Sequence, residues 1–206
     1  MYPTATVPER IADGFMHFLG VFGAIFGTIY LLSINTLTAP LAVYGISLIA
    51  AFSASAVYNM VPYDAPRPLL RRIDHAMIYV LIAGTYTPLV VILDTTMGYV
   101  ILTIVWLLAL IGLTLKLFFW RKPGRFGPAL YLVMGWLSIF LIWALIPVVS
   151  STVVWLIAAG GLLYTAGVPI YAAKRLSFST AIWHGFVVVA SACFFAAIAV
   201  GATSLT

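Results

Sequence analysis

The chain has 206 residues, of which 64% are hydrophobic and only 7% are charged, and its mean hydropathy is +1.16. Soluble domains carry about 25% charged residues, so this composition excludes a soluble globular protein and indicates a polytopic membrane protein. In so apolar a chain the net charge of +5 is better explained by loop orientation than by nucleic acid, and no nucleic-acid partner is expected.

Charges, prolines and glycines divide the chain into apolar segments of membrane-spanning length, at roughly 20 residues a span. The predicted helices cover about residues 13–34, 40–61, 71–93, 98–119, 127–147, 151–172 and 179–201. Strands are excluded because the chain lacks the alternation of a closed barrel, and an open sheet in lipid would leave backbone groups unpaired. The predicted fold is therefore all-α, a single seven-helix transmembrane domain over residues 1–206.

The basic residues all fall on one side of this arrangement. They precede the first helix or lie in the second, fourth and sixth connections, at Arg10, Arg67, Arg71, Arg72, Lys116, Arg121, Lys122, Arg125, Lys174 and Arg175. The positive-inside rule then places the N-terminus in the cytoplasm and the C-terminus outside, which requires an odd number of helices. A multi-pass protein of the plasma or inner membrane is predicted.

One stretch, from Ser53 to Pro88, places Ser55, Asn59 and Asp74 beside two long apolar segments. Two interpretations of the carboxylate stay open. Asp74 either pairs with Arg71 at the water boundary, or it lines a polar site inside the bundle, as intramembrane acids usually do.

Three pairs of polar residues are spaced four apart, so that each pair shares a helix face. They are Ser55 and Asn59, Asp13 and His17, and Thr180 and His184. The predicted topology places all of them in one layer near the cytoplasmic side, so a site built from them would open there. Taken alone, Ser55 and Asn59 are better explained by ordinary interhelical hydrogen bonds, and Asp13 with His17 by a pair at the membrane interface.

His184 is the histidine that most needs a partner, because it lies within an otherwise apolar run. Asp74 could accept a hydrogen bond from its ring, an arrangement that serves a general base and a metal ligand alike. A catalytic zinc needs about three protein ligands. The sequence offers His184 and Asp74 as good ligands. Asn59 and Thr180 are neutral side chains and weak ligands for zinc.

Glycines recur at helical spacing in the first and sixth predicted helices, at Gly20, Gly23 and Gly27 and at Gly160 and Gly167. Faces of small residues allow membrane helices to approach closely, so these positions predict helix–helix contacts.

Several long motifs, in order along the chain, resemble the haemolysin III proteins, which are bacterial members of the progestin and adipoQ receptor group. They are ERIADGFMHFLG from Glu9, SAVYN from Ser55, RRIDHAMIYVLIAGTYTP from Arg71, GGLLYTAGVPIYAAKR from Gly160 and IWHGFVVVASACFFAAI from Ile182. The resemblance implies seven helices, a cytoplasmic N-terminus and an intramembrane zinc near the cytoplasmic face.

The family's zinc is held by a histidine on the second helix and two histidines four apart on the seventh, and an aspartate on the third helix holds a zinc-bound water. By this resemblance Asp74, His184 and Ser55 stand at family positions. Asn59 and Thr180 stand where two of the three histidine ligands are expected, and Phe194 replaces another histidine. The resemblance thus implies a degenerate zinc site.

Three functions follow as hypotheses. The first is a zinc-dependent hydrolase of a lipid amide or ester, in which Asp74 accepts a proton from water and Ser55 helps to bind the oxyanion. The second is a zinc-free protein that binds lipid or affects the state of the membrane, with Asp74 and His184 as a structural ion pair. The third is a pore. The substitutions at Asn59 and Thr180 favour the second, membrane lipids are the expected partners, and no soluble protein partner is evident.

Overall fold

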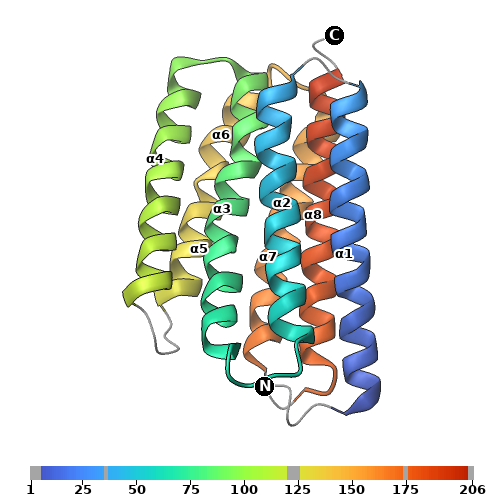
Figure 1. Ribbon diagram of the computed structural model, residues 1–206. Helices are drawn as coiled ribbons and strands as arrows, with labels where there is room; N and C mark the ends of the chain where they lie inside the picture. Colours follow the sequence, from blue (N-terminus) through green and yellow to red (C-terminus); the bar gives the residue numbers. More distant parts are fainter. Residues whose placement is uncertain (1–5, 35–36, 120–125, 174–175, 204–206) are drawn as a thin grey trace.

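The computed structural model describes residues 6–34, 37–119, 126–173 and 176–203, which form a bundle of helices (Figure 1). The elements are α1 (Val7–Ile34), α2 (Thr38–Met60), α3 (Arg67–Leu93), α4 (Thr96–Thr114), the π-helix η2 (Leu115–Phe119), α5 (Phe126–Trp136), α6 (Ser138–Leu145), α7 (Ser151–Ala172) and α8 (Ser179–Thr203). No strand occurs within these ranges, which confirms the all-α prediction. Five of the basic residues used for the topology, Arg121, Lys122, Arg125, Lys174 and Arg175, lie outside the described residues.

Six helices in the described ranges are long and apolar enough to cross a membrane, and α4 with η2 counts as one of them. The shorter apolar segment Ala129–Leu145, made of α5 and α6, is the seventh. The number of apolar segments therefore agrees with the seven predicted helices.

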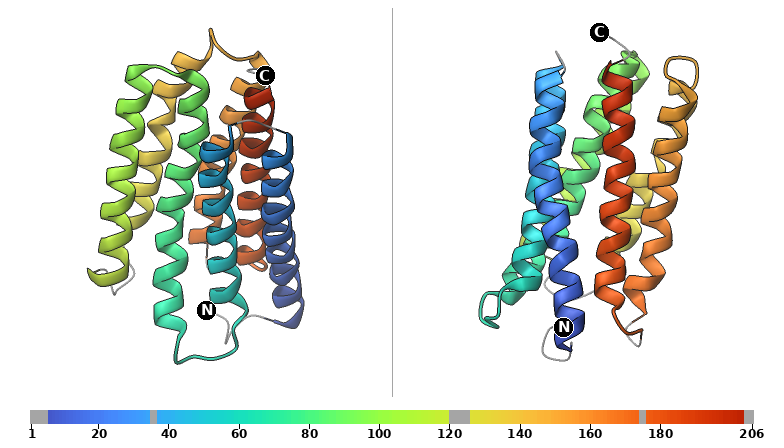
Figure 2. Two further views of the ribbon diagram at one scale, coloured as in Figure 1. Left: turned by 45° about the horizontal axis from the view of Figure 1, so that its top comes forward. Right: turned by 90° about the vertical axis from the view of Figure 1, so that its right-hand side faces the viewer.

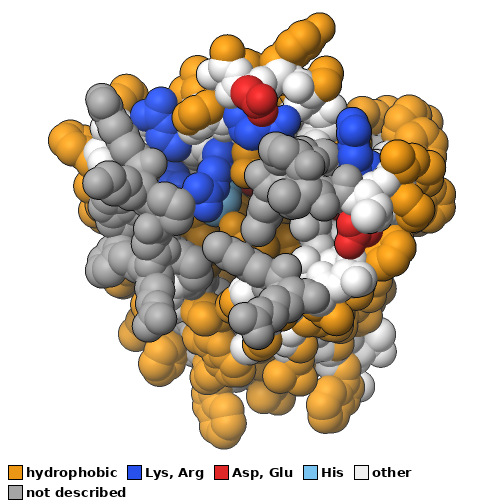
Figure 3. All heavy atoms as spheres, turned by 90° about the horizontal axis from the view of Figure 1, so that it is seen from below, with side chains coloured by type: hydrophobic (Ala, Val, Ile, Leu, Met, Phe, Trp, Pro, Cys, Tyr) orange, Lys and Arg blue, Asp and Glu red, His pale blue; other side chains and the backbone are white. Residues whose placement is uncertain are grey.

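The most extensive contacts join α1 to α2, α2 to α3, α3 to α4 and α7 to α8, and α1 also packs against α8 (Figures 1 and 2). The contact between α1 and α8 brings together residues that are far apart in the sequence. The end of the bundle where α1 begins is here called the basic end, because Arg10, Arg67, Arg71, Arg72 and Lys116 lie there (Figure 3).

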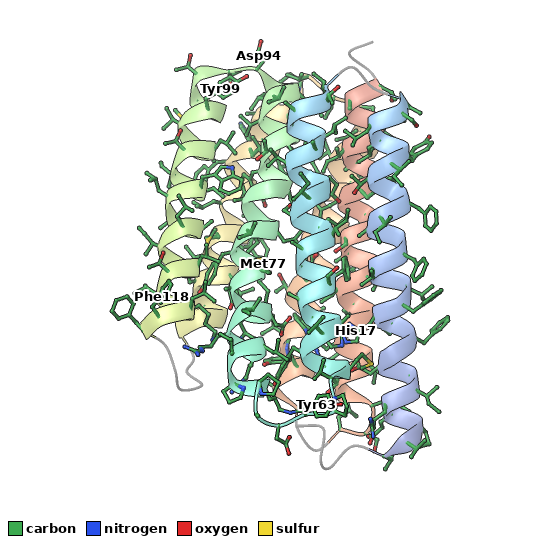
Figure 4. All side chains as sticks on the ribbon, in the orientation of Figure 1. His17, Tyr63, Met77, Asp94, Tyr99 and Phe118 are labelled. Atoms are coloured by element: carbon green, nitrogen blue, oxygen red, sulfur yellow. The ribbon has the colours of Figure 1, made fainter. Side chains whose placement is uncertain are left out.

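The outer surface of the bundle is apolar, as a lipid-facing surface must be. On α1, Phe15, Phe18 and Phe26 are all exposed, and on η2 Phe118 points away from the bundle (Figure 4). The interior is filled mainly by aliphatic and aromatic side chains. Apolar side chains on both sides of each helix explain why the sequence reads as continuous apolar runs rather than as amphipathic stripes.

The first helix begins at Val7, six residues before the predicted start at residue 13. Its start has one half of a capping box: the backbone N–H of Thr6 donates to Oε2 of Glu9 at 2.8 Å, and the Thr6 hydroxyl donates to the same oxygen at 2.9 Å. The charged residues just before the predicted first helix are therefore part of α1. Asp13 and His17 consequently lie one turn apart inside a regular helix.

The fifth predicted helix, 127–147, is divided into α5 and α6. The cause is a side chain from α3: the Tyr86 hydroxyl donates to the carbonyl of Met134 at 2.8 Å and approaches that of Gly135 at 3.3 Å. A group inserted into the backbone ladder in this way interrupts a helix. Hydropathy does not predict the interruption between α5 and α6, because the apolar segment is continuous across it.

Candidate metal centre

Two acidic or imidazole side chains of α1 meet one of α8 inside the bundle. They are Asp13, His17 and His184, and one ligand atom from each lies within 4.8 Å of the others. All three residues are buried, with exposed fractions of 2%, 4% and 9% respectively. Figure 4 shows His17 between the helices, nearer to the basic end than to the opposite end. The spacing of four along α1 directs Asp13 and His17 to the same neighbour.

The Asp13 carboxylate faces both imidazoles. Nδ1 of His184 donates to Oδ1 of Asp13 at 2.5 Å, since an ionised carboxylate can only accept. Nε2 of His17 lies 3.5 Å from Oδ2 of the same carboxylate. The two rings are 4.3 Å apart between centroids and are inclined at 53°. The three side chains therefore form one compact polar group at the α1–α8 contact.

The other ring nitrogen of His184 faces α2. The Oγ atom of Ser55 lies 3.4 Å from Nε2 of His184. The Asn59 amide in turn donates to the carbonyl of Ser55 at 3.0 Å and lies 3.5 Å from its hydroxyl. Ser55 and Asn59, predicted to share a face, thus lie next to the group, and Asn59 is bonded to its own helix.

Asp74 on α3 lies near the Ser55 side chain and the His184 imidazole. It also lies 4.0 Å from Nε2 of His75, the next residue of its own helix. It is outside the three-residue group, so the carboxylate that hydrogen-bonds His184 is Asp13. Thr180, one turn before His184 on α8, is half-buried and is also outside the group.

The three side chains fit a transition-metal ion, on two observations. Nε2 of His17 is fully buried and has no hydrogen-bond partner in the described part of the chain, which is a costly state for a ring nitrogen unless it binds something. Two imidazoles and one carboxylate are also a donor set used by catalytic zinc, which leaves a fourth position open.

Asp13 and His17 stood out in the sequence only as a pair of polar residues four apart. Their meeting with His184 depends on the α1–α8 contact, which joins residues 171 positions apart in the chain. The one local signal available was the motif Thr6 to Glu9, which predicts a helix start before Asp13.

Comparison with known proteins agrees with this fold. A family model described as Haemolysin-III related matches residues 6–195, a range that contains all of the side chains above. The Hemolysin-3 homolog of Bacillus subtilis (strain 168) is 36% identical over 197 residues, which is 92% of each chain. The Hemolysin-3 of Bacillus cereus is 35% identical over 199 residues, which is 93% of this chain and 91% of the other. This multi-pass membrane protein therefore belongs to the haemolysin III family.

Proposed function

We propose that the protein binds a divalent transition-metal ion at Asp13, His17 and His184 and hydrolyses an ester or amide bond of a membrane lipid there. The observation that carries the proposal is the convergence of these three buried ligand atoms within 4.8 Å. The two missing family histidines, at Asn59 and Thr180, are then replaced by two ligands from α1. By the positive-inside rule the basic end faces the cytoplasm, and the site lies towards it.

The chain supplies two further groups that hydrolysis needs. A divalent ion in the group would supply Lewis acidity for attack on a carbonyl. Asp74 offers a carboxylate, near Ser55 and His184, that can take a proton from an attacking water. The Ser55 hydroxyl can donate a hydrogen bond to the oxygen that becomes negative.

An apolar groove beside the group supports a lipid substrate. It has a volume of about 670 Å³, lies between α1, α7 and α8, and is lined by residues that include Ala12, Met16, Ala181 and Gly185. Ala12 and Met16 directly precede Asp13 and His17 in the chain, and Gly185 follows His184. Because the groove lies on membrane-spanning helices, an acyl chain is the natural occupant.

A second candidate is a metal-free protein that binds lipid without chemistry. It is favoured by the hydrogen bond of 2.5 Å between His184 and Asp13, which already satisfies both groups without an ion. In that case the pair is a structural one that joins α1 to α8.

A pore, which the names of the relatives suggest, is not supported by the interior. Buried residues towards the end opposite the basic end are mainly apolar within the described ranges, among them Leu31, Leu41, Val90 and Ile198. A water-filled path would need polar side chains along its whole length.

The metal content of the purified protein tests the proposal. Wild-type protein should carry ~1 metal ion per chain by elemental mass spectrometry, as expected for one three-ligand site. His17→Gln should lose it, because the orphaned nitrogen is a ligand, whereas the control His75→Gln should keep it. A chelator should lower the melting temperature of the wild type but not of His17→Gln, because a ligand bound only to the folded state stabilises it. Metal-free wild-type protein, after expression with added zinc, would contradict the proposal and favour the second candidate.

A further inference from the structure

Lys116 is buried near the basic end, with an exposed fraction of only 9%. Lysine is almost never so buried unless it is paired. Within the described ranges its ammonium has neither a hydrogen bond nor an ion pair within 4.0 Å, although Arg71 and Asp74 lie close enough for their charges to act on it. The positive-inside rule explains a lysine at this end of the molecule, but it does not explain a buried one.

Two other cations of this end, Arg72 and Arg67, differ from Lys116 and Arg71. Arg72 donates from Nη1 to the carbonyl of Leu117 at 2.7 Å and so ties η2 to α3. Arg67 donates to the Asp64 carboxylate at 3.3 Å and to the Val61 carbonyl at 3.1 Å. Both therefore have structural acceptors.

Arg71 and Lys116 lie close enough for their charges to repel each other, and the Asp74 carboxylate lies close enough to attract both. Two cations and one anion in a partly buried site leave an uncompensated positive charge, which a bound anion would neutralise. Figure 3 shows the basic side chains gathered on this face, with a histidine visible among them.

Tyrosine hydroxyl groups from two more helices, α7 and α2, lie near this group of charges. The Tyr171 hydroxyl of α7 lies 3.5 Å from Nε2 of His75. The His75 ring in turn interacts electrostatically with Lys116 and Arg71. Tyr58 of α2 lies near Arg71, Asp74 and Tyr171. Several hydroxyl and cationic donors around one point match the several oxygens of a phosphate group better than they match a single-oxygen acceptor.

We propose that Arg71 and Lys116 bind a phosphate group at the basic end of the bundle, carried by a lipid head group or by a soluble phosphate. Asp74 lies near this subsite and also near Ser55 and His184, so a bound phospholipid would have its head group next to the candidate metal centre. The subsite itself needs no metal, and its test is one of binding.

The test uses purified full-length protein in a neutral detergent, with the melting temperature followed by tryptophan fluorescence. Phosphatidic acid at ~100 times its dissociation constant should raise the melting temperature by roughly 5–10 °C. Phosphatidylcholine, whose choline cation offsets its phosphate, should not. A comparable rise with inorganic phosphate alone identifies a soluble ligand, and a rise with phosphatidic acid only identifies a lipid.

Variants separate this subsite from general attraction of anions to a basic surface. Lys116→Gln and Arg71→Gln should each lose the shift. The matched control Arg10→Gln removes one positive charge from an exposed side chain of the same end and should keep it, and Lys116→Arg should keep it too. Without phosphate, Lys116→Gln should melt no lower than the wild type, because it relieves the repulsion from Arg71.

Either of two results overturns the proposal. One is the absence of any shift with phosphatidic acid or phosphate in the wild type. The other is an equal shift in Arg10→Gln, Arg71→Gln and Lys116→Gln. If Lys116→Gln does not fold, Arg71→Gln against Arg10→Gln decides the question, since Arg71 is less deeply buried than Lys116.

Discussion

The buried carboxylate of Asp13 serves two imidazoles at once. A buried charge is costly unless hydrogen bonds compensate it, and here the N–H of His184 does so at 2.5 Å. His17, at 3.5 Å from the second oxygen, has no such bond. The imbalance makes His17 the residue that gains most from a metal ion.

Asp74 is the residue whose role is easiest to separate from metal binding. Asp74→Asn keeps the size of the side chain but removes its ability to take a proton. Hydrolysis of a fluorogenic lipid ester should therefore fall by at least about 10²-fold, while metal content stays at the wild-type level. The control Asp94→Asn changes a carboxylate at the opposite end of the bundle and should alter neither (Figure 4).

Either of two results would revise that role. Turnover at the wild-type rate in Asp74→Asn would remove Asp74 from the chemistry. Loss of the metal together with the activity would make it a ligand.

Among the helices, α7 and α8 make the most extensive contact, and glycine permits it. A Cβ atom at Gly160 would lie 2.7 Å from the Phe194 ring of α8 and 3.2 Å from the Ala190 carbonyl, whereas one at Gly161 would meet nothing within 4 Å. The glycines of α1 also differ in whether another helix packs against them. Gly20 and Gly27 face Phe52 and Phe195, but Gly23 faces open space.

Adjacent glycines on α7 give a matched test of this packing. Gly160→Ala should destabilise the protein by about 1–3 kcal/mol, because the backbone carbonyl opposite it cannot move aside. Gly161→Ala should be neutral or should stabilise by up to about 1 kcal/mol, because alanine is the better helix former. Thermal unfolding of both variants in one detergent compares them, and equal changes would contradict the assigned α7–α8 contact.

For the whole molecule, the charge distribution makes a prediction about orientation. The basic end should face the cytoplasm, and because α8 ends at the opposite end of the bundle, the C-terminus should lie outside. In a bacterial host, alkaline phosphatase fused after Thr206 should be active and a green fluorescent protein fused there should not fluoresce. The same fluorescent protein fused before Met1 should fluoresce. A fluorescent C-terminal fusion would reverse the topology.

The residue-level features of the site were predictable only in part. Spacing correctly placed Ser55 beside Asn59 and Asp13 beside His17, because helical periodicity is a local property. The hydrogen-bond partner of His184 was not predictable. Asp13 and Asp74 both lay at a suitable depth, and the choice between them depends on which helix packs against α8.

Local patterns were enough to predict the class of protein, the number of apolar segments and the end at which the basic residues gather. These follow from composition and hydropathy, which are sums over neighbouring residues. Three other features became apparent only in the folded chain: the meeting of α1 with α8 at the candidate metal centre, the burial of Lys116 near Arg71, and the interruption between α5 and α6 at Tyr86. Each depends on contacts between residues far apart in the chain, and in lipid such contacts are selected by close packing and polar pairing, which hydropathy does not record.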